Sequence, residues 1–188
     1  MNQHTSTVQS RSLRSSAQLY WMLLSALMIA IIVVASQIVI PLPMVPINLG
    51  LLAVFVTGFV LNKRWAMIAV GLYLLMGAFG LPVFANFRGG PQALFGNTGG
   101  YLLGYFLSVA IIALLRDRAV TFVQRALLCG VALLACYIPG TAWLMFLTGR
   151  SLVEVLPFAV YPFIPGDILK CVLAAWLSLR LDKLPRPV

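Results

Sequence analysis

Long apolar segments dominate this sequence and leave few folds open to it. Hydrophobic residues make up 62% of the 188 residues and charged residues only 9%, whereas soluble domains carry about 25% charged residues. A membrane-spanning helix needs about 20 residues, most of them apolar. The chain is therefore long enough for about six spans, with no room for a soluble domain. We predict an all-α integral membrane protein that lies in the lipid bilayer.

The predicted helices are separated by stretches rich in proline, glycine or basic residues. The second and third helices are short for a full span, and Pro139-Gly140 should kink or break the fifth helix near its far end. Residues 1–16 form a polar tail, and residues 17–188 form a single six-helix transmembrane domain. The expected helices cover about residues 19–40, 48–61, 65–80, 99–115, 119–147 and 165–181.

The distribution of Lys and Arg predicts how this bundle lies in the membrane. With six helices, ten basic residues fall on one side and only Arg88 and Arg150 on the other. Cytoplasmic loops carry the excess of Lys and Arg, so we expect a multi-pass protein of the cell membrane with both termini in the cytoplasm. The same topology explains the net charge of +9 without nucleic acid as a partner. The ten residues are Arg11, Arg14, Lys63, Arg64, Arg116, Arg118, Arg125, Arg180, Lys183 and Arg186.

Two connections on the predicted extracellular side contain unusual residues. Pro41, Pro43 and Pro46 make a stiff, apolar link that is either a lid over a cavity or an ordinary turn between spans. Residues 81–100 combine five glycines with hydrogen-bonding and aromatic side chains. Long structured loops are often binding loops. In this loop Asn86 is either a ligand contact or a turn residue, and Arg88 is either an anion contact or a rim charge.

Catalysis and metal binding receive little support from the sequence. No nucleophile elbow, metal-ligand spacing or nucleotide-binding motif is present, and the single histidine, His4, lies in the polar tail. The three cysteines lie inside apolar segments, where they are typical of small apolar filler. We therefore expect neither an enzyme nor a metal site nor a cofactor. If transport is driven by ATP, the ATPase must be another chain.

Two charges inside the last apolar segment are the strongest functional signal. Asp167 and Lys170 are three residues apart, so on a helix they share one face. In a bilayer each charge costs roughly 2.5–3.5 kcal/mol, and something must compensate that cost. Either the two side chains pair only with each other, or they bind a small ligand that offers hydrogen-bond donors to Asp167 and a carboxylate to Lys170.

The first apolar segment contains a pair of small residues four positions apart. Ala26 and Ala30 form a small-xxx-small motif, which lets another helix approach closely. The motif predicts a close-packed face, and the spacing fits internal packing within the bundle as well as a surface for a partner.

Several of these motifs together resemble the BioY family, the biotin-binding S components of energy-coupling-factor (ECF) transporters. The resemblance covers the first to the last predicted helix and is carried by Gly80-Leu-Pro-Val-Phe84, Thr98-Gly-Gly-Tyr-Leu-Leu-Gly104, Pro162-Phe-Ile-Pro-Gly-Asp-Ile-Leu-Lys170 and the Pro41-to-Pro46 connection. It implies a bundle of six transmembrane helices with structured extracellular loops that close over biotin.

The resemblance also implies roles for individual residues. Asn86 and Asp167 would bind the ureido ring of biotin, and Lys170 would bind its valerate carboxylate. Asn97 in the same loop is an alternative to Asn86, and Arg88 is a weaker candidate. Small residues of the first helix would dock on the partner, which favours that role for Ala26 and Ala30.

The expected function is therefore high-affinity biotin capture and translocation as the S component of an ECF-type ABC transporter. The expected partners are a transmembrane coupling subunit and two ATP-binding subunits. Two alternatives are an S component for another vitamin, such as thiamine or riboflavin, and a structural membrane protein in which Asp167 and Lys170 form only an internal pair.

Overall fold

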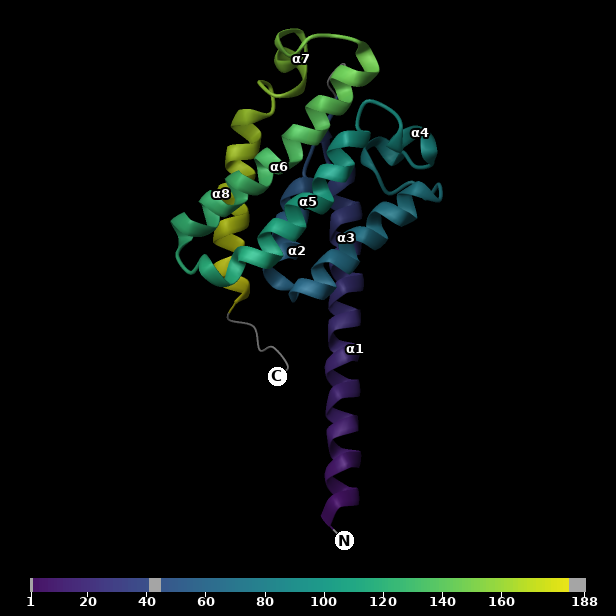
Figure 1. The fold of residues 1–188 in the computed structure, drawn as a ribbon, viewed down its shortest axis with the longest axis vertical. Helices are drawn as coiled ribbons and strands as arrows, with labels where there is room; N and C mark the ends of the chain where they lie inside the picture. The colour runs from purple at the N-terminus through teal and green to yellow at the C-terminus, as the bar shows by residue number, and fades with distance from the viewer. Residues whose placement is uncertain (1, 41–44, 183–188) are drawn as a thin grey trace.

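The structure is a computed structural model that describes residues 2–40 and 45–182. It is built from helices, with one short two-stranded antiparallel sheet in which Val39 pairs with Asn48 and Ile40 with Ile47 (Figure 1). In chain order the elements are α1 Asn2–Gln37, β1 Val39–Ile40, β2 Ile47–Asn48, α2 Gly50–Val60, α3 Lys63–Ala78, η1 Ala85–Phe87, α4 Pro91–Leu94, α5 Gly99–Leu115, η2 Arg116–Arg118, α6 Phe122–Thr148, α7 Leu152–Ala159 and α8 Ile164–Leu181.

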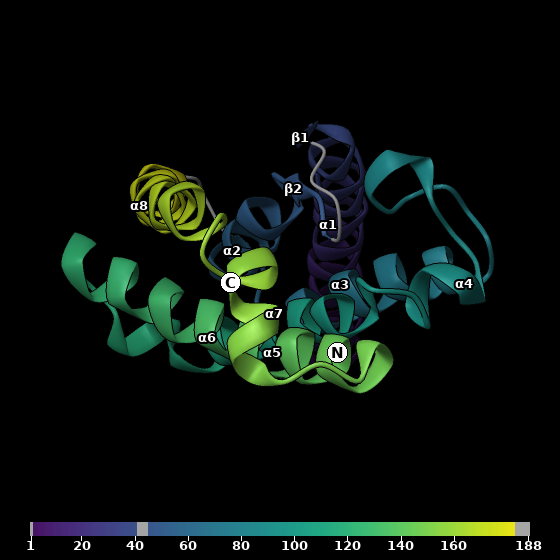
Figure 2. The ribbon, with the colours of Figure 1, turned by 90° about the horizontal axis from the view of Figure 1, so that it is seen from above.

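Helix α2 lies at the centre of the bundle. Ten of its 11 residues are buried, as expected for a helix that is apolar on all sides. It contacts α1, α3, α5 and α8, and Figure 2 shows it between α1 and α8. Because α2 is held on all sides, its first turn and the preceding end of β2 are held in place, and both face the cavity described below.

Helices α5 and α6 pack closely through glycines. A Cβ atom at Gly104 would lie 2.7 Å from the Cα of Cys136, and one at Gly100 would lie 2.4 Å from the carbonyl oxygen of Pro139. Helix α6 continues through Pro139 to Thr148, so a break at Pro139 does not occur. This close packing brings the tyrosines of α5 and α6 to the same wall of the cavity.

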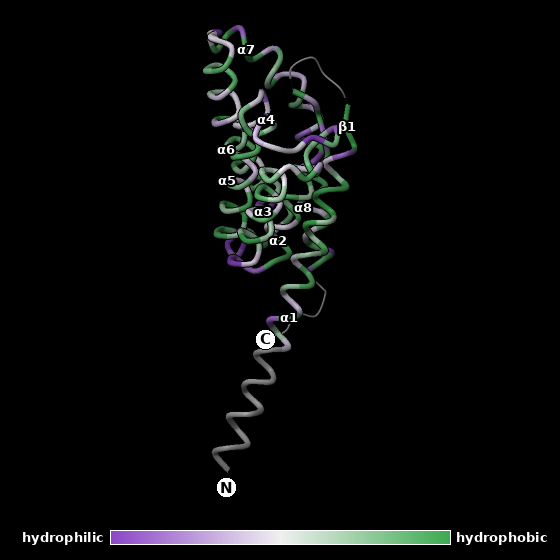
Figure 3. The backbone as a smooth tube through the Cα atoms, turned by 90° about the vertical axis from the view of Figure 1, so that its right-hand side faces the viewer, coloured by the Kyte–Doolittle hydropathy of each residue, from purple (hydrophilic) through white to green (hydrophobic). Residues whose placement is uncertain are grey.

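The outer surface and the lengths of several helices are those of a membrane protein. Among the described residues, three helices are long and apolar enough to cross a membrane, and α7 with α8 forms a fourth candidate that is bent by 58°. Helix α2 is apolar but shorter. Figure 3 shows hydrophobic residues along most of the bundle. The fold is therefore all-α with several membrane-type helices.

Most predicted helix bounds agree with the structure to within a few residues, and α5 matches the predicted range 99–115. Helix α1 differs: it begins at Asn2 and so includes most of the predicted polar tail, and it projects from the bundle (Figure 1). It ends at Gln37, because Val39 and Ile40 pair with β2 instead of continuing the helix. Pro41 and Pro43 of the proline-rich connection lie outside the described residues.

The two ends of the bundle differ in character. Both termini lie at one end, and α4 and α7 lie at the other (Figure 1). At the end with the termini, Arg125 of α6 donates to the carbonyl of Ala119 and the hydroxyl of Ser178, both at 3.0 Å, and pairs with Asp182. These contacts tie α6 to α8 at the end of the bundle away from α4 and α7.

Candidate ligand-binding site

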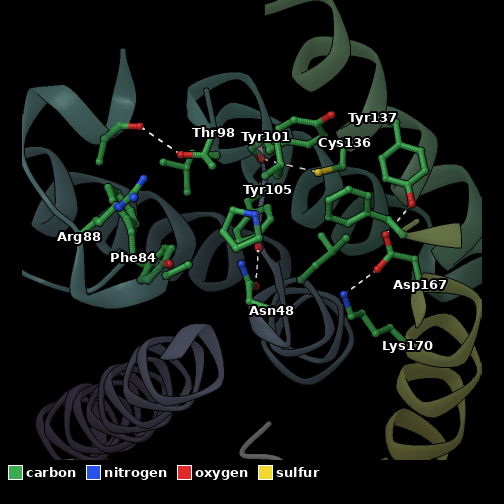
Figure 4. A pocket seen from close by; sticks show the side chains of 18 residues that line it. Asn48, Phe84, Arg88, Thr98, Tyr101, Tyr105, Cys136, Tyr137, Asp167 and Lys170 are labelled. Atoms are coloured by element: carbon green, nitrogen blue, oxygen red, sulfur yellow. Dashed lines mark hydrogen bonds and ion pairs between the residues drawn. The ribbon is translucent and has the colours of Figure 1, made fainter. Parts of the chain in front are cut away.

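A cavity opens between the bundle and its loops at the end opposite the termini (Figure 4). The space between its wall atoms, together with the part that is open to solvent, amounts to about 760 Å³. Its lining comes from α2, α3, α4, α5, α6 and α8 and from the segments before α2 and α4. The main polar groups on the wall are Asn48, Arg88, Thr98, Tyr101, Tyr105, Tyr137, Asp167 and Lys170.

The Asp167–Lys170 pair is buried on the α8 side of this cavity. The Nζ of Lys170 donates to Oδ1 of Asp167 at 2.6 Å, and the hydroxyl of Tyr137 donates to Oδ2 at 2.6 Å. Asp167 is 2% exposed and Lys170 5%. Both carboxylate oxygens are therefore engaged, whereas the ammonium, which carries three donors, uses one of them on the described residues.

Asn48 lies between the buried pair and the far wall of the cavity (Figure 4). Its Oδ1 accepts from the backbone N–H of Gly50 at 2.8 Å and from the hydroxyl of Tyr105 at 3.0 Å. These two bonds fix the orientation of the amide. Within the described residues its amide nitrogen has no acceptor, so it offers donors to a ligand.

Arg88 belongs to the opposite wall, together with Phe84 (Figure 4). It closes a tight turn in which the backbone N–H groups of Phe84 and Arg88 each donate to the carbonyl of the other, at 3.0 and 3.3 Å. Arg88 forms no ion pair with a described residue. The cavity therefore has a buried charge pair on one wall and an unpaired cation on the other.

The structure brings Asp167, Lys170 and Arg88 together around one cavity. Asn86 and Asn97 are exposed and do not line it. Asn86 instead takes a left-handed conformation (φ 60°) inside the turn, which asparagine tolerates better than most residues. The asparagine on the cavity wall is Asn48, and Asn86 is a turn residue.

Sequence reasoning missed four polar residues of the wall. They are spread over segments far apart in the chain, so spacing alone does not connect them. A signal exists for the tyrosines, because a tyrosine inside an apolar segment usually needs a hydrogen-bond partner for its hydroxyl. The missed residues are Asn48, Tyr101, Tyr105 and Tyr137.

The geometry suits binding better than catalysis. A carboxylate beside an ammonium presents an acceptor next to donors, which matches a planar group that carries N–H beside C=O. The cation on the far wall suits an anionic tail. No group of three or more His, Cys, Asp or Glu in the described part of the chain could hold a metal ion.

Comparison with known proteins decides the family. The sequence matches the BioY family over residues 4–186. The chain belongs to the BioY family. A relative named biotin transporter BioY from Thermotoga maritima is 43% identical over 156 residues, which is 82% of this chain and 91% of the relative. BioY2 of Lactococcus lactis, named a biotin transporter, is 35% identical over 88% of this chain and 92% of its own length.

The fold of this chain is similar to that of a solved structure. A crystal structure of the S component for biotin from an ECF-type ABC transporter superposes with a TM-score of 0.82 at 25% identity. The match covers 90% of this chain and 94% of that one. The similarity in fold therefore extends over nearly the whole chain.

We predict that Lys170→Met destabilises the protein far more than Lys63→Met. Removing one partner of a buried ion pair costs about 3–5 kcal/mol, whereas an exposed pair contributes about 0–1 kcal/mol. Lys63 is a matched control because it pairs with Asp117 at 3.0 Å with both side chains about half exposed (49% and 62%). Thermal unfolding in detergent measures both changes. Equal, small losses would show that Asp167 does not depend on Lys170.

Proposed function

We propose that this chain is a biotin-binding S component, which captures biotin with high affinity for translocation by an ECF-type ABC transporter. It acts as a binding and transport protein rather than as an enzyme, with biotin as its substrate and no cofactor. The observation that carries the proposal is the buried Asp167–Lys170 pair on the wall of a cavity lined by polar and aromatic side chains. Family membership and the names of the relatives support biotin as the ligand.

The contact between Asp167 and Lys170 determines how biotin would lie. The ureido group and the carboxylate are at opposite ends of biotin, but Oδ1 of Asp167 and Nζ of Lys170 are only 2.6 Å apart. The same end of the ligand therefore meets both residues. The ureido group fits, because its N–H donates to Asp167 while its carbonyl accepts from Lys170. This arrangement differs from the one that the sequence resemblance implies, in which Lys170 binds the carboxylate.

The other end of biotin would then face Arg88. A carboxylate pairs well with a guanidinium through charge-assisted hydrogen bonds, and Arg88 has no ion-pair partner among the described residues. At the end of biotin that meets Asp167 and Lys170, the amide of Asn48 on the cavity wall offers further donors to the ureido carbonyl. Apolar lining such as Phe84 and Leu102 would contact the ring system and the valeryl chain.

We further propose that α1, α2, α3, α5, α6 and α8 are the six spans, with residues 17–188 as one transmembrane domain. Both termini, including the polar residues 1–16, would be cytoplasmic, and the loops around the cavity would be extracellular. The excess of Lys and Arg at the end with the termini supports this orientation. A short span such as α2 needs local thinning of the bilayer or burial by its neighbours.

The proposed partners are a transmembrane coupling subunit and two ATP-binding subunits. Ala26 and Ala30 are both exposed on α1, so the described part of the chain does not bury them. Small exposed residues four apart let a partner helix approach closely. We assign this face of α1 to the coupling subunit.

Bulky substitutions on this face should weaken assembly without changing biotin binding by the isolated chain. Overpacking a close contact costs about 1–3 kcal/mol, so Ala26→Trp and Ala30→Trp should lower the affinity for the coupling subunit by about tenfold or more. Leu127→Trp enlarges an exposed α6 side chain and serves as the control (66% exposed). The assay is titration of the coupling module in detergent or nanodiscs. Full affinity in both alanine variants would refute the assignment.

The site assignment predicts a specific pattern for biotin and biotinamide, its neutral analogue with the same shape. The wild-type protein should bind biotin about tenfold more tightly than biotinamide, because a hydrogen bond to a charged group contributes about 1.5–3 kcal/mol. Arg88→Met should abolish this difference. Asp167→Asn and Lys170→Met should weaken both ligands by about thirtyfold or more.

Calorimetric titration of the purified chain measures these affinities. A difference that survives in Arg88→Met but disappears in Lys170→Met would mean that Lys170 binds the carboxylate. Absence of biotin binding by the wild type would refute biotin as the ligand and direct the search to other vitamins.

A further inference from the structure

The side chain of Gln37, at the end of α1, forms hydrogen bonds with the loop that follows α3. Its Nε2 donates to the carbonyls of Val83 and Phe84 at 3.3 and 3.1 Å, and its Oε1 accepts from the backbone N–H of Phe87 at 2.9 Å. The same nitrogen lies 3.4 Å from the carbonyl of Val33 in its own helix. A single amide therefore binds both arms of the Phe84–Arg88 turn.

This turn needs outside support. Asn86 and Phe87 are consecutive residues with positive φ, 60° and 55°, and neither is glycine. Such conformations persist only where the surroundings hold them in place. The Phe87 side chain is 72% exposed, so little packing on that side chain helps. Within residues 2–40 and 45–182, the hydrogen bonds that hold the turn, apart from the paired N–H groups of Phe84 and Arg88, come from Gln37.

The same turn builds one wall of the cavity. Phe84, Ala85 and Arg88 all line it, and the exposed Arg88 side chain has no ion pair among the described residues to hold it in place. Its position therefore depends on the backbone of the turn.

We infer that Gln37 is a positioning residue: it holds the Phe84–Arg88 turn in the shape that directs Arg88 into the cavity. This inference rests on the proposed function, in which Arg88 binds the carboxylate of biotin. Gln37 itself does not line the cavity. Its effect on binding should therefore act through Arg88 and should depend on the charge of the ligand.

The test compares biotin with biotinamide on purified full-length variants. Gln37→Met keeps the length of the side chain but removes all its hydrogen bonds. It should reduce the roughly tenfold preference for biotin to less than about threefold, with biotinamide affinity changed by less than about threefold. The ratio of two affinities does not depend on the fraction of protein that is folded. Ser25→Ala is the control, because it removes one side-chain hydrogen bond within α1, to the carbonyl of Trp21, and should keep the full preference.

Two further variants sharpen the test. In Arg88→Met, adding Gln37→Met should cause no further loss of preference, since residues that act through one another are not additive. Gln37→Glu keeps an acceptor for the Phe87 N–H but loses the donors to Val83 and Phe84, and it should also lower the preference. It replaces Gln37→Met if that variant does not fold.

Each other outcome overturns a distinct claim. A preference that stays intact in Gln37→Met, or equal losses for both ligands, would reduce Gln37 to a residue of general structural importance and overturn the inference alone. A wild-type protein that binds both ligands equally would overturn the role of Arg88 and, with it, that of Gln37. A wild-type protein that binds no biotin would overturn the proposed function itself.

Discussion

The contact between Asp167 and Lys170 is the interaction on which the rest of the site depends. Two buried charges in a membrane-type helix are costly unless each has partners. Here the hydroxyl of Tyr137 in α6 donates a hydrogen bond to the second carboxylate oxygen of Asp167. The pair therefore fixes α8 against α6 and leaves donors of the ammonium directed at a cavity. The same pair that joins two helices is therefore the one to which we assign recognition of the ligand.

The packing of the bundle sets the geometry around this pair. Glycines let α5 approach α6 closely, so Tyr101 and Tyr137 lie on one wall. The buried α2 holds Asn48 at its start, where two hydrogen bonds fix the amide. The loop after α3 supplies the opposite, cationic wall. In the proposed orientation of biotin, the helices would therefore hold the ureido end and the Phe84–Arg88 turn would contact the carboxylate end.

The sequence predicted the helical architecture and most helix bounds, because the spacing of apolar residues is a local signal. It also singled out Asp167, Lys170 and Arg88 as candidates, and the structure places all three around one cavity. It did not predict that Asn48 and not Asn86 lines the cavity. That choice depends on the left-handed turn at Asn86 and on the β1–β2 pairing, which joins segments on either side of the proline-rich connection. The contact of Tyr137 with Asp167 spans 30 positions and arises only from helix packing.

The most direct measurement is an experimental structure of this protein with biotin bound. We predict that the ureido ring lies within hydrogen-bond distance of Asp167 and Lys170, with the carboxylate at Arg88. A carboxylate bound to Lys170 and separated from Arg88 would contradict the proposed orientation. A ligand outside this cavity would contradict the assignment of the site.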